Sequence, residues 1–251
     1  MARIDDLLER ALKTLRPKPA ESTSAPTKKA YSEEVSKVVA QAFAEELRHR
    51  GLNEARPAPP GELGDSGAER RMAGGIGAKK VDVTWATEES GLLFAISIKS
   101  INFRDVKTKN FQKNLTNRRG DMLIEAVTLH RRFPYAVLAG FFFLDKDAEK
   151  DNTVTSKGKA KRRSTFLNAH TRLKLFTGRN DPAGRDEQYE RFYLLLLDVS
   201  PSKAGVRAFE VGKPNAQIPL GEVFDQLVTL IAERNPDFYE CIDGQLVRAS
   251  A

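Results

Sequence analysis

The stretch that decides the fold is residues 74–103, GGIGAKKVDVTWATEESGLLFAISIKSINF. Residues 79–85 alternate around Val81 and Val83, and residues 92–99 alternate along the chain with one largely apolar face. Alternation with a period of two predicts strands, and the intervening Thr-Glu-Glu-Ser-Gly is typical of a tight turn between antiparallel strands. The stretch is therefore predicted to form a β-hairpin.

Helical and strand patterns alternate on both sides of this hairpin. Residues 135–144 (YAVLAGFFFL) and 190–199 (ERFYLLLLDV) are apolar enough to be strands buried on both faces. A strand, a helix and a second strand in sequence imply a right-handed parallel crossover. The fold class predicted is α/β, a mixed sheet flanked by helices. The helices are expected at 31–50, 115–132, 165–177 and 220–234, and a short edge strand at 205–211.

The N-terminal part is expected to stand apart from this body. Residues 2–15 have the apolar spacing of a short amphipathic helix. Residues 16–30 contain three prolines and many small polar residues, which is a linker composition. The predicted organisation is a helix within residues 1–15, a linker over 16–30 and a single domain over 31–251. Residues 51–78 hold three prolines and seven glycines and predict a long loop.

Composition and charge narrow the classes of function. The 251 residues include 41 Lys and Arg against 34 Asp and Glu, so the formal net charge is +7, which favours anionic partners. Cys241 is the single cysteine, so no intrachain disulfide forms, and three scattered histidines argue against a Cys/His zinc site. The apolar runs are too short to cross a bilayer. We therefore expect a cytoplasmic protein without membrane association.

Two charged residues in the hairpin suggest chemistry. Asp82 interrupts an apolar strand, and Lys99 ends the apolar run of the second strand. If the turn is centred on residues 88–90, the two side chains lie near each other at the same end of the hairpin. A carboxylate beside an ammonium at a sheet end can hold a divalent ion and polarise a water molecule. Either charge could equally be an ordinary solvent-facing side chain.

The hairpin resembles the active-site hairpin of the PD-(D/E)XK nuclease superfamily, the restriction endonuclease-like fold, and the resemblance covers about residues 31–145. In that family an acidic residue opens the hairpin and an acid-x-Lys triplet closes it. The two acids hold Mg²⁺, and the lysine activates water or stabilises the phosphorane. Asp82 matches the first acid and Lys99 matches the lysine. The resemblance implies Asp82 as a metal ligand and Lys99 as a catalytic residue.

The sequence departs from the family pattern at the second acid, where it has Ser97. A serine hydroxyl lacks the negative charge that Mg²⁺ prefers. Either the fold is catalytically inactive, or another acid replaces the missing charge. Some restriction endonucleases that this sequence resembles carry Ser-x-Lys and recruit a glutamate from the following helix. Glu125 is the first candidate and Asp121 the second, although both could lie on a solvated helix face.

The helix before the hairpin offers another acid. Glu46 falls in the middle of the apolar stripe of residues 31–47, and a buried glutamate costs free energy unless it is paired or metal-bound. The superfamily often has a glutamate on this helix that points at the metal. We therefore expect Glu46 to be a metal ligand and catalytic residue, with Glu34 a weaker candidate. A glutamate at the end of the stripe could also reach water.

The segment that leaves the active-site strand is strongly basic. Residues 99–119 contain seven Lys and Arg and one acid, Asp105. Side chains of these types and interleaved amides contact phosphates and base edges. A second basic cluster covers residues 157–163, and basic loops of this kind can also be solvated surface. The predicted nucleic-acid-binding residues are Asn102, Arg104, Lys107, Lys109, Gln112, Lys113, Arg118 and Arg119.

Together these features predict a Mg²⁺-dependent DNA endonuclease of the restriction or phage-defence type, with Mn²⁺ expected to substitute for Mg²⁺. Asp82, Glu46 and Glu125 would bind the metal, and Ser97 would hydrogen-bond a metal-bound water or a phosphate oxygen. The expected partners are DNA and either a second copy of the chain or a defence-system protein. A catalytically inactive nucleic-acid-binding module is the alternative from another class. An RNA-directed nuclease is a third option that the sequence does not separate from the first.

Overall fold

A computed structural model of the chain describes residues 2–63, 70–73, 78–152, 163–200 and 204–250. Its centre is a six-stranded sheet in the order β3-β4-β5-β6-β7-β8. The strands are β3 (Val83–Thr87), β4 (Gly91–Ile101), β5 (Val137–Asp145), β6 (Arg191–Asp198), β7 (Gly205–Glu210) and β8 (Gln217–Ile218). The pairs β4–β5 and β5–β6 are parallel, and the other three are antiparallel. The predicted mixed sheet is confirmed.

The predicted hairpin is formed by β3 and β4, but the first predicted strand, residues 79–85, is divided at Asp82 between β2 (Ala78–Val81) and β3. Trp85 lies opposite Phe94 in its register, and Gly91 adopts a φ of +69° where the chain enters β4. A left-handed backbone conformation favours glycine, which has no Cβ to clash. The strand β4 has β3 on one side and β5 on the other, so its long apolar run is buried in the sheet interior.

The crossover from β4 to β5 runs through α3 (Leu115–His130), as expected for two parallel neighbours. Every residue of β5 is buried. Gly140 lets α3 and β6 come close to this strand. A Cβ on Gly140 would lie 2.8 Å from the Phe192 ring and 3.1 Å from the Met122 side chain. A larger residue at this position would therefore clash first with the Phe192 ring of β6.

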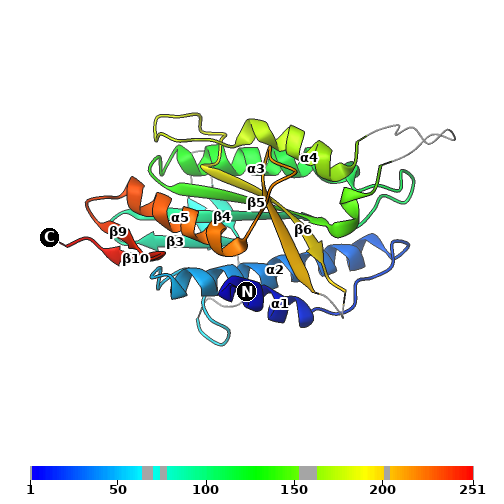
Figure 1. The fold of residues 1–251 in the computed structure, drawn as a ribbon, viewed down its shortest axis with the longest axis horizontal. Helices are drawn as coiled ribbons and strands as arrows, with labels where there is room; N and C mark the ends of the chain where they lie inside the picture. The colour runs from blue at the N-terminus through cyan, green and yellow to red at the C-terminus, as the bar shows by residue number, and fades with distance from the viewer. Residues whose placement is uncertain (1, 64–69, 74–77, 153–162, 201–203, 251) are drawn as a thin grey trace.

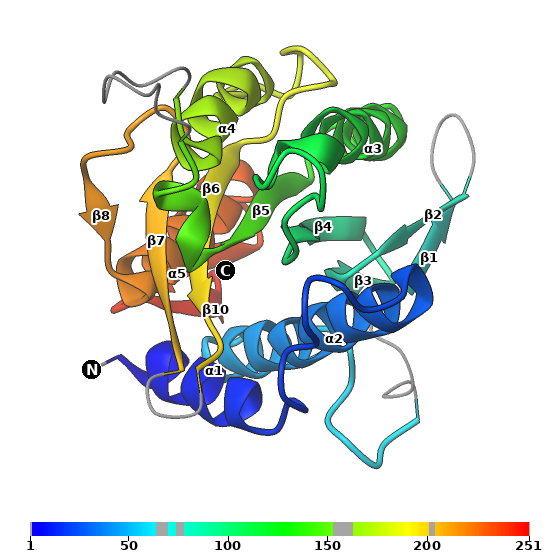
Figure 2. The ribbon, with the colours of Figure 1, turned by 90° about the vertical axis from the view of Figure 1, so that its right-hand side faces the viewer.

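Helices cover both faces of the sheet and make three layers. One face carries α1 (Arg3–Lys13), α2 (Ala25–His49) and α5 (Leu220–Arg234), and the other carries α3 and α4 (Thr165–Leu173). Figures 1 and 2 show α1 and α2 below the sheet and α3 and α4 above it. On the α2 side, the Phe43 ring packs with its centroid 4.8 Å from that of Phe141 and 5.3 Å from that of Phe224.

The prediction that residues 1–15 stand apart behind a linker is wrong. In α1, Ile4, Leu7, Leu8 and Leu12 are all buried in the same core as α2, α5 and the sheet. The helix α2 begins at Ala25, not at residue 31, so more than a third of the expected linker is helical. The start signal was Ser24, which caps the helix, followed by a proline in its first turn.

Smaller elements complete the fold. Antiparallel pairs are formed by β1 (Arg70–Ala73) with β2 (Ala78–Val81), and by β9 (Tyr239–Ile242) with β10 (Gln245–Arg248). Short 3₁₀ helices cover Gln112–Asn114, Lys146–Glu149 and Lys174–Phe176. The strand β7 is not the sheet edge along its whole length, because β8 pairs with Ala208 and Phe209.

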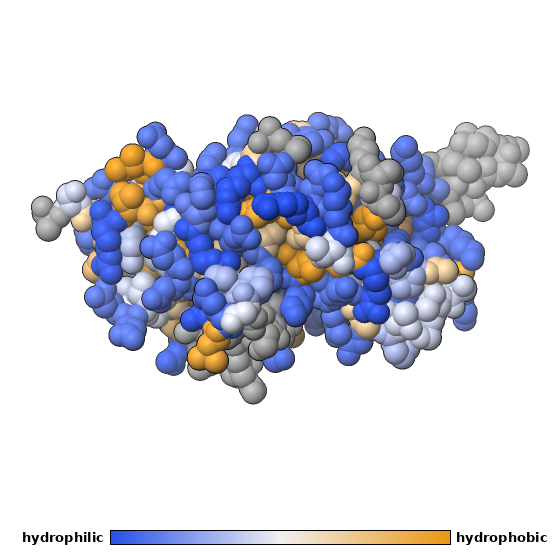
Figure 3. Space-filling view, turned by 90° about the horizontal axis from the view of Figure 1, so that it is seen from below, coloured by the Kyte–Doolittle hydropathy of each residue, from blue (hydrophilic) through white to orange (hydrophobic). Residues whose placement is uncertain are grey.

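The surface is polar over most of the face that α1 and α2 form, with small separate hydrophobic spots (Figure 3). Among the described residues, no helix combines the length and the apolar character needed to cross a membrane.

Candidate active site

Asp82 lies at the break between β2 and β3, where the chain leaves the small β1–β2 pair and enters the main sheet. Its carboxylate is turned toward β4, and Oδ2 accepts a hydrogen bond from the backbone N–H of Ile98 at 2.6 Å. The residue is 8% exposed. Asp82 is therefore not a solvent-facing strand residue, and its carboxylate is held beside the end of β4.

Lys99 projects from that end of β4 between two carboxylates. Its Nζ lies 3.3 Å from Oε2 of Glu125 and 3.8 Å from Oδ2 of Asp82. Glu125 comes from α3, which packs over β4. The expected proximity of Asp82 and Lys99 is confirmed, and Glu125 joins them. Both acids reach the same ammonium, so the three side chains form one charged cluster.

Asp121, one turn earlier on α3, does not join the cluster. Its side chain is 54% exposed and lies 3.6 Å from Arg118. The two residues lie one turn apart on nearly the same side of α3, but packing buries Glu125 and leaves Asp121 exposed.

Ser97 lies two residues before Lys99, so the two side chains share one face of β4. Within the described part of the chain, Ser97 Oγ and Glu125 Oε1 are buried oxygens without a hydrogen-bond partner of normal geometry. The hydroxyl still lies close enough to the Glu125 carboxyl to lower its pKa. Buried oxygens are normally satisfied. Here the Ser97 hydroxyl and the Glu125 carboxyl lie against each other, so each supplies part of the other's polar contacts.

The electrostatics of the cluster follow from burial and from the close opposite charges. Burial raises the pKa of Glu125, and Asp82 raises it further, while Lys99 pulls it down; the net direction is upward. Burial by itself lowers the pKa of Lys99, but the carboxylates of Glu125 and Asp82 more than offset this, so its pKa is raised. Lys99 is therefore charged at neutral pH, and Glu125 takes up a proton more readily than an ordinary glutamate.

Glu46 is not part of this site, and that prediction is wrong. It is buried, as its place in the apolar stripe suggested, but it pairs with Arg3 at 3.1 Å and with Arg50 at 2.7 Å. Residues of α2 up to Lys37 reach the site, and Glu46 lies nine residues later, about 14 Å along the helix axis. Two arginines supply the charge that the sequence argument assigned to a metal. The weaker candidate on this helix, Glu34, pairs with Arg16 at 2.7 Å.

Asp82 and Lys99 open into a cleft of about 760 Å³. One wall is the first half of α2, and the other is residues 98–106 with the start of the next helix. In Figure 2 this side faces the viewer, with α2 below β4 and α3 above it. The lining contains seven basic and three acidic side chains, so the cleft carries a net positive charge around the two acids and the ammonium.

The predicted nucleic-acid-binding residues divide into three groups. Asn102, Arg104, Lys113 and Arg118 line the cleft. Lys107 and Lys109 are exposed on the loop beyond it. Gln112 and Arg119 turn away: Gln112 accepts a hydrogen bond from Asn168 at 2.8 Å, and Arg119 lies 5.7 Å from the Phe176 ring centroid. The predicted cluster at 157–163 lies outside the described residues, apart from Arg163.

Two of the cleft-lining basic residues have acidic partners within 3 Å. Lys113 lies 2.7 Å from Asp105, which also accepts from the backbone of Thr108, and the pKa of Asp105 is strongly lowered. Arg104 pairs with Asp147 at 2.8 Å. Asp105 therefore neutralises part of the charge that the sequence count assigned to this segment.

The sequence argument missed the α2 wall. Lys28, Lys29, Ser32, Ser36 and Lys37 all line the cleft. Part of this face was assigned to a linker, because three prolines precede Lys28. The sequence did contain a signal for this wall: these residues are spaced three and four apart, which places their side chains on one face of a helix.

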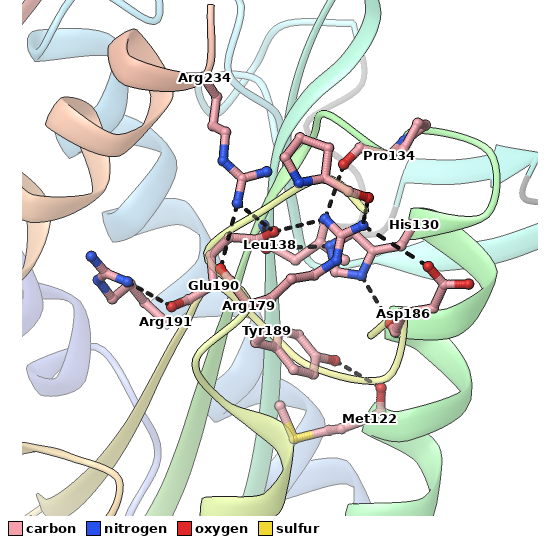
Figure 4. A network of polar contacts seen from close by, with 11 residues as sticks. Met122, His130, Pro134, Leu138, Arg179, Asp186, Tyr189, Glu190, Arg191 and Arg234 are labelled. Carbon is pink, nitrogen blue, oxygen red and sulfur yellow. Dashed lines mark hydrogen bonds and ion pairs between the residues drawn. The ribbon is translucent and has the colours of Figure 1, made fainter. Parts of the chain in front are cut away.

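A second charged cluster lies on the other side of α3 and serves the fold. Glu190 accepts from His130 at 3.2 Å, from the Leu138 N–H at 2.8 Å and from Arg179 at 3.0 Å (Figure 4). Burial alone would raise its pKa, but these donors hold the pKa of Glu190 below its usual value. None of these residues lines the cleft. The cluster ties the end of α3 to β5 and β6.

Over the described residues, no group of three or more His, Cys, Asp or Glu side chains is placed to hold a metal ion. Asp82 and Glu125 are a pair of acids, and Ser97 stands at the position predicted for the second acid. No protein-family model, curated protein or solved structure matches this chain, so its function has to be argued from these residues.

Proposed function

We propose that the chain is a Mg²⁺-dependent DNA endonuclease with a restriction endonuclease-like fold, of the restriction or phage-defence type. The observation that carries the proposal is the cluster at the base of the basic cleft. There, the Lys99 ammonium lies 3.3 Å from Glu125 and 3.8 Å from Asp82. These are the acid and the lysine that the hairpin pattern singles out, together with a glutamate from the following helix in place of the acid missing at Ser97.

The donor atoms of this cluster suit Mg²⁺ in type and number. Mg²⁺ prefers oxygen ligands and is commonly held by one or two carboxylates, with water and substrate phosphate completing its shell. Asp82 and Glu125 supply two carboxylates, and the Ser97 hydroxyl beside Glu125 adds a neutral oxygen. Two acids in place of three are therefore compatible with this metal, with Mn²⁺ as its substitute.

Each side chain has a separate role in the proposed reaction. When bound, Mg²⁺ would polarise the phosphate and lower the pKa of a coordinated water. Lys99 is charged at neutral pH, which supports a role in orienting the water and offsetting the negative charge that develops on the phosphate. Ser97 would donate its hydroxyl hydrogen to a phosphate oxygen or accept one from a water.

The basic cleft supports DNA as the substrate. Lys and Arg on both walls would neutralise phosphates, and such contacts supply much of the affinity for nucleic acid. A nuclease of a restriction or defence system meets its DNA in the cytoplasm. A second copy of the chain or a protein of the same system is the protein partner to seek.

The second candidate is a nucleic-acid-binding module that does not cleave. Ser97 and the ammonium already shared by Asp82 and Glu125 favour it, because Lys99 neutralises part of the charge that would attract a metal. Titration calorimetry with Mn²⁺ on the full chain separates the two candidates. An enzyme is expected to bind the ion and to lose this binding in Asp82→Asn, whereas an inactive module is expected to bind none.

The direct experiment incubates the purified chain with plasmid DNA, phage DNA and an RNA of similar length, with Mg²⁺ or with a chelator. Cleavage of DNA is expected with Mg²⁺ and not with the chelator. Glu125→Gln should abolish it, and Asp121→Asn is the matched control on the same helix, since its carboxylate is exposed. Equal loss in both variants would contradict the assigned site. Cleavage of RNA but not DNA would overturn the substrate, and no cleavage with intact binding would favour the inactive module.

A further inference from the structure

The cleft has a second wall that the hairpin pattern does not explain. In α2, the residues that line it are Ala25, Lys28, Lys29, Ser32, Glu33, Ser36 and Lys37. Their spacing of three and four places them on one helix face, next to the face that packs Tyr31, Val35 and Val39 into the core. The rigid α2 helix therefore presents three ammonium groups and two hydroxyls across the cleft from Lys99.

Two of these lysines are available to a ligand. Lys29 has a side chain that is 78% exposed, and its Nζ is 3.7 Å from Glu33, which is a weak surface pair. Lys37 is exposed and has no ion pair among the described residues. Lys28 is engaged, since it donates to the backbone oxygen of Glu21 and lies 5.6 Å from the Phe103 ring centroid. Among the described residues, neither Lys29 nor Lys37 makes a strong ion pair, and both charged side chains line the cleft.

The charged groups at the base are recessed between the two walls. The Lys99 and Asp82 side chains are 17% and 11% exposed, and Glu125 lies behind them at 6%. A cleft of about 760 Å³ is of the size that encloses a drug-sized molecule, within roughly 300–1,000 Å³. A phosphate reaches the base only if its strand enters between the walls, and a single strand is narrower than a duplex.

From these observations we infer that the cleft takes a single DNA strand, and that Lys29 and Lys37 of α2 bind its sugar–phosphate backbone from the side opposite Arg118 and Lys113. A positively charged groove that tracks the backbone is one of the two features, beside aromatic side chains that stack on bases, by which proteins bind single-stranded nucleic acid. This inference rests on the proposed function for the identity of the ligand as DNA. It adds that the preferred substrate is unpaired where it enters the cleft.

The test measures binding and cleavage separately on the full chain. Fluorescence anisotropy with a labelled single-stranded oligonucleotide and its duplex, in chelator, gives affinities without cleavage. Tighter binding of the single strand is expected. The double variant Lys29→Gln/Lys37→Gln should bind the single strand with a shallower plot of log binding constant against log salt concentration. The magnitude of the slope should fall by about 0.7 for each phosphate that the variant no longer neutralises. The control, Lys174→Gln/Lys213→Gln, removes the same charge from exposed positions outside the cleft and should leave the slope unchanged.

The outcomes separate this inference from the proposed function. Duplex binding as tight as single-strand binding, or an unchanged slope in the α2 variant, overturns the inference even if Mg²⁺-dependent cleavage is present. Single-strand binding through α2 without any cleavage supports the inference and overturns the nuclease. No binding to either form of DNA overturns both.

Discussion

Replacing Lys99 by methionine tests the site through stability as well as activity. The change keeps a long side chain but removes the ammonium that lies 3.3 Å from Glu125 and 3.8 Å from Asp82. Breaking a buried ion pair by removing one partner commonly costs about 3–5 kcal/mol, because the remaining charge is left unpaired. Glu125 limits this cost, since its pKa is already raised and a proton can neutralise it.

The direction of the pH dependence follows from the pKa of Glu125 in the folded wild type and in the folded variant. In Lys99→Met, the loss of the ammonium raises the pKa of Glu125 further above the unfolded value. A raised carboxyl pKa means that the folded state holds the proton longer than the unfolded state does. Stability is then present at low pH and lost as pH rises through the folded pKa. The stability gap between wild type and variant should widen by up to about 1.4 kcal/mol per pH unit between the two pKa values.

Urea unfolding of both proteins from pH 5 to pH 8 measures this gap. Lys107→Met is the matched control, because Lys107 is exposed and has no ion pair among the described residues. Cleavage should fall by about 10²–10³-fold or more in Lys99→Met, the usual cost of losing one group that stabilises developing charge. A gap that stays constant with pH, or cleavage at the wild-type rate, would refute the reasoning about this cluster.

Three further outcomes are expected. Combined Lys107→Gln, Lys109→Gln and Lys113→Gln should lower the log–log salt slope of duplex binding by about 0.9 for each phosphate that is no longer neutralised, and an unchanged slope would place these lysines away from DNA. Glu46→Gln should lower stability by about 1.5–3 kcal/mol, because it weakens charged hydrogen bonds to two arginines, yet leave cleavage intact; a folded but inactive variant would restore Glu46 to the site. Leu8→Ala should cost about 2–5 kcal/mol in a thermal or urea melt, whereas a separate N-terminal helix would give almost no change.

Local patterns in the sequence were sufficient for the elements and for part of the site. The alternation around Val83 and along residues 92–99 depends on side chains a few positions apart, so it predicts the hairpin without knowledge of the rest of the chain. The turn between the strands then requires Asp82 and Lys99 to lie at the same end, because antiparallel strands pair residue against residue. The order of strand, helix and strand likewise implied the parallel pair β4–β5.

Long-range contacts decided what local patterns left open. Burial of Glu46 was predictable from its helical face, but a buried charge can be satisfied by a metal or by arginines. Arg3, which is 43 residues away in sequence, is brought to it by the packing of α1. The choice of Glu125 over Asp121 also depended on tertiary packing, because the two lie on nearly the same side of α3 and only Glu125 is buried.

The division between domain and linker was decided in the same way. By composition alone, the prolines at 17, 19 and 26 predict a linker. Pro26 instead lies in the first turn of α2, where the missing N–H costs nothing, and the four buried side chains of α1 hold the preceding segment to the core. The sequence alone determined the hairpin and the pairing of Asp82 with Lys99. The tertiary structure alone decided which carboxylate completes the cluster and that α2 forms the second wall of the cleft, because both depend on helices packed from distant parts of the chain.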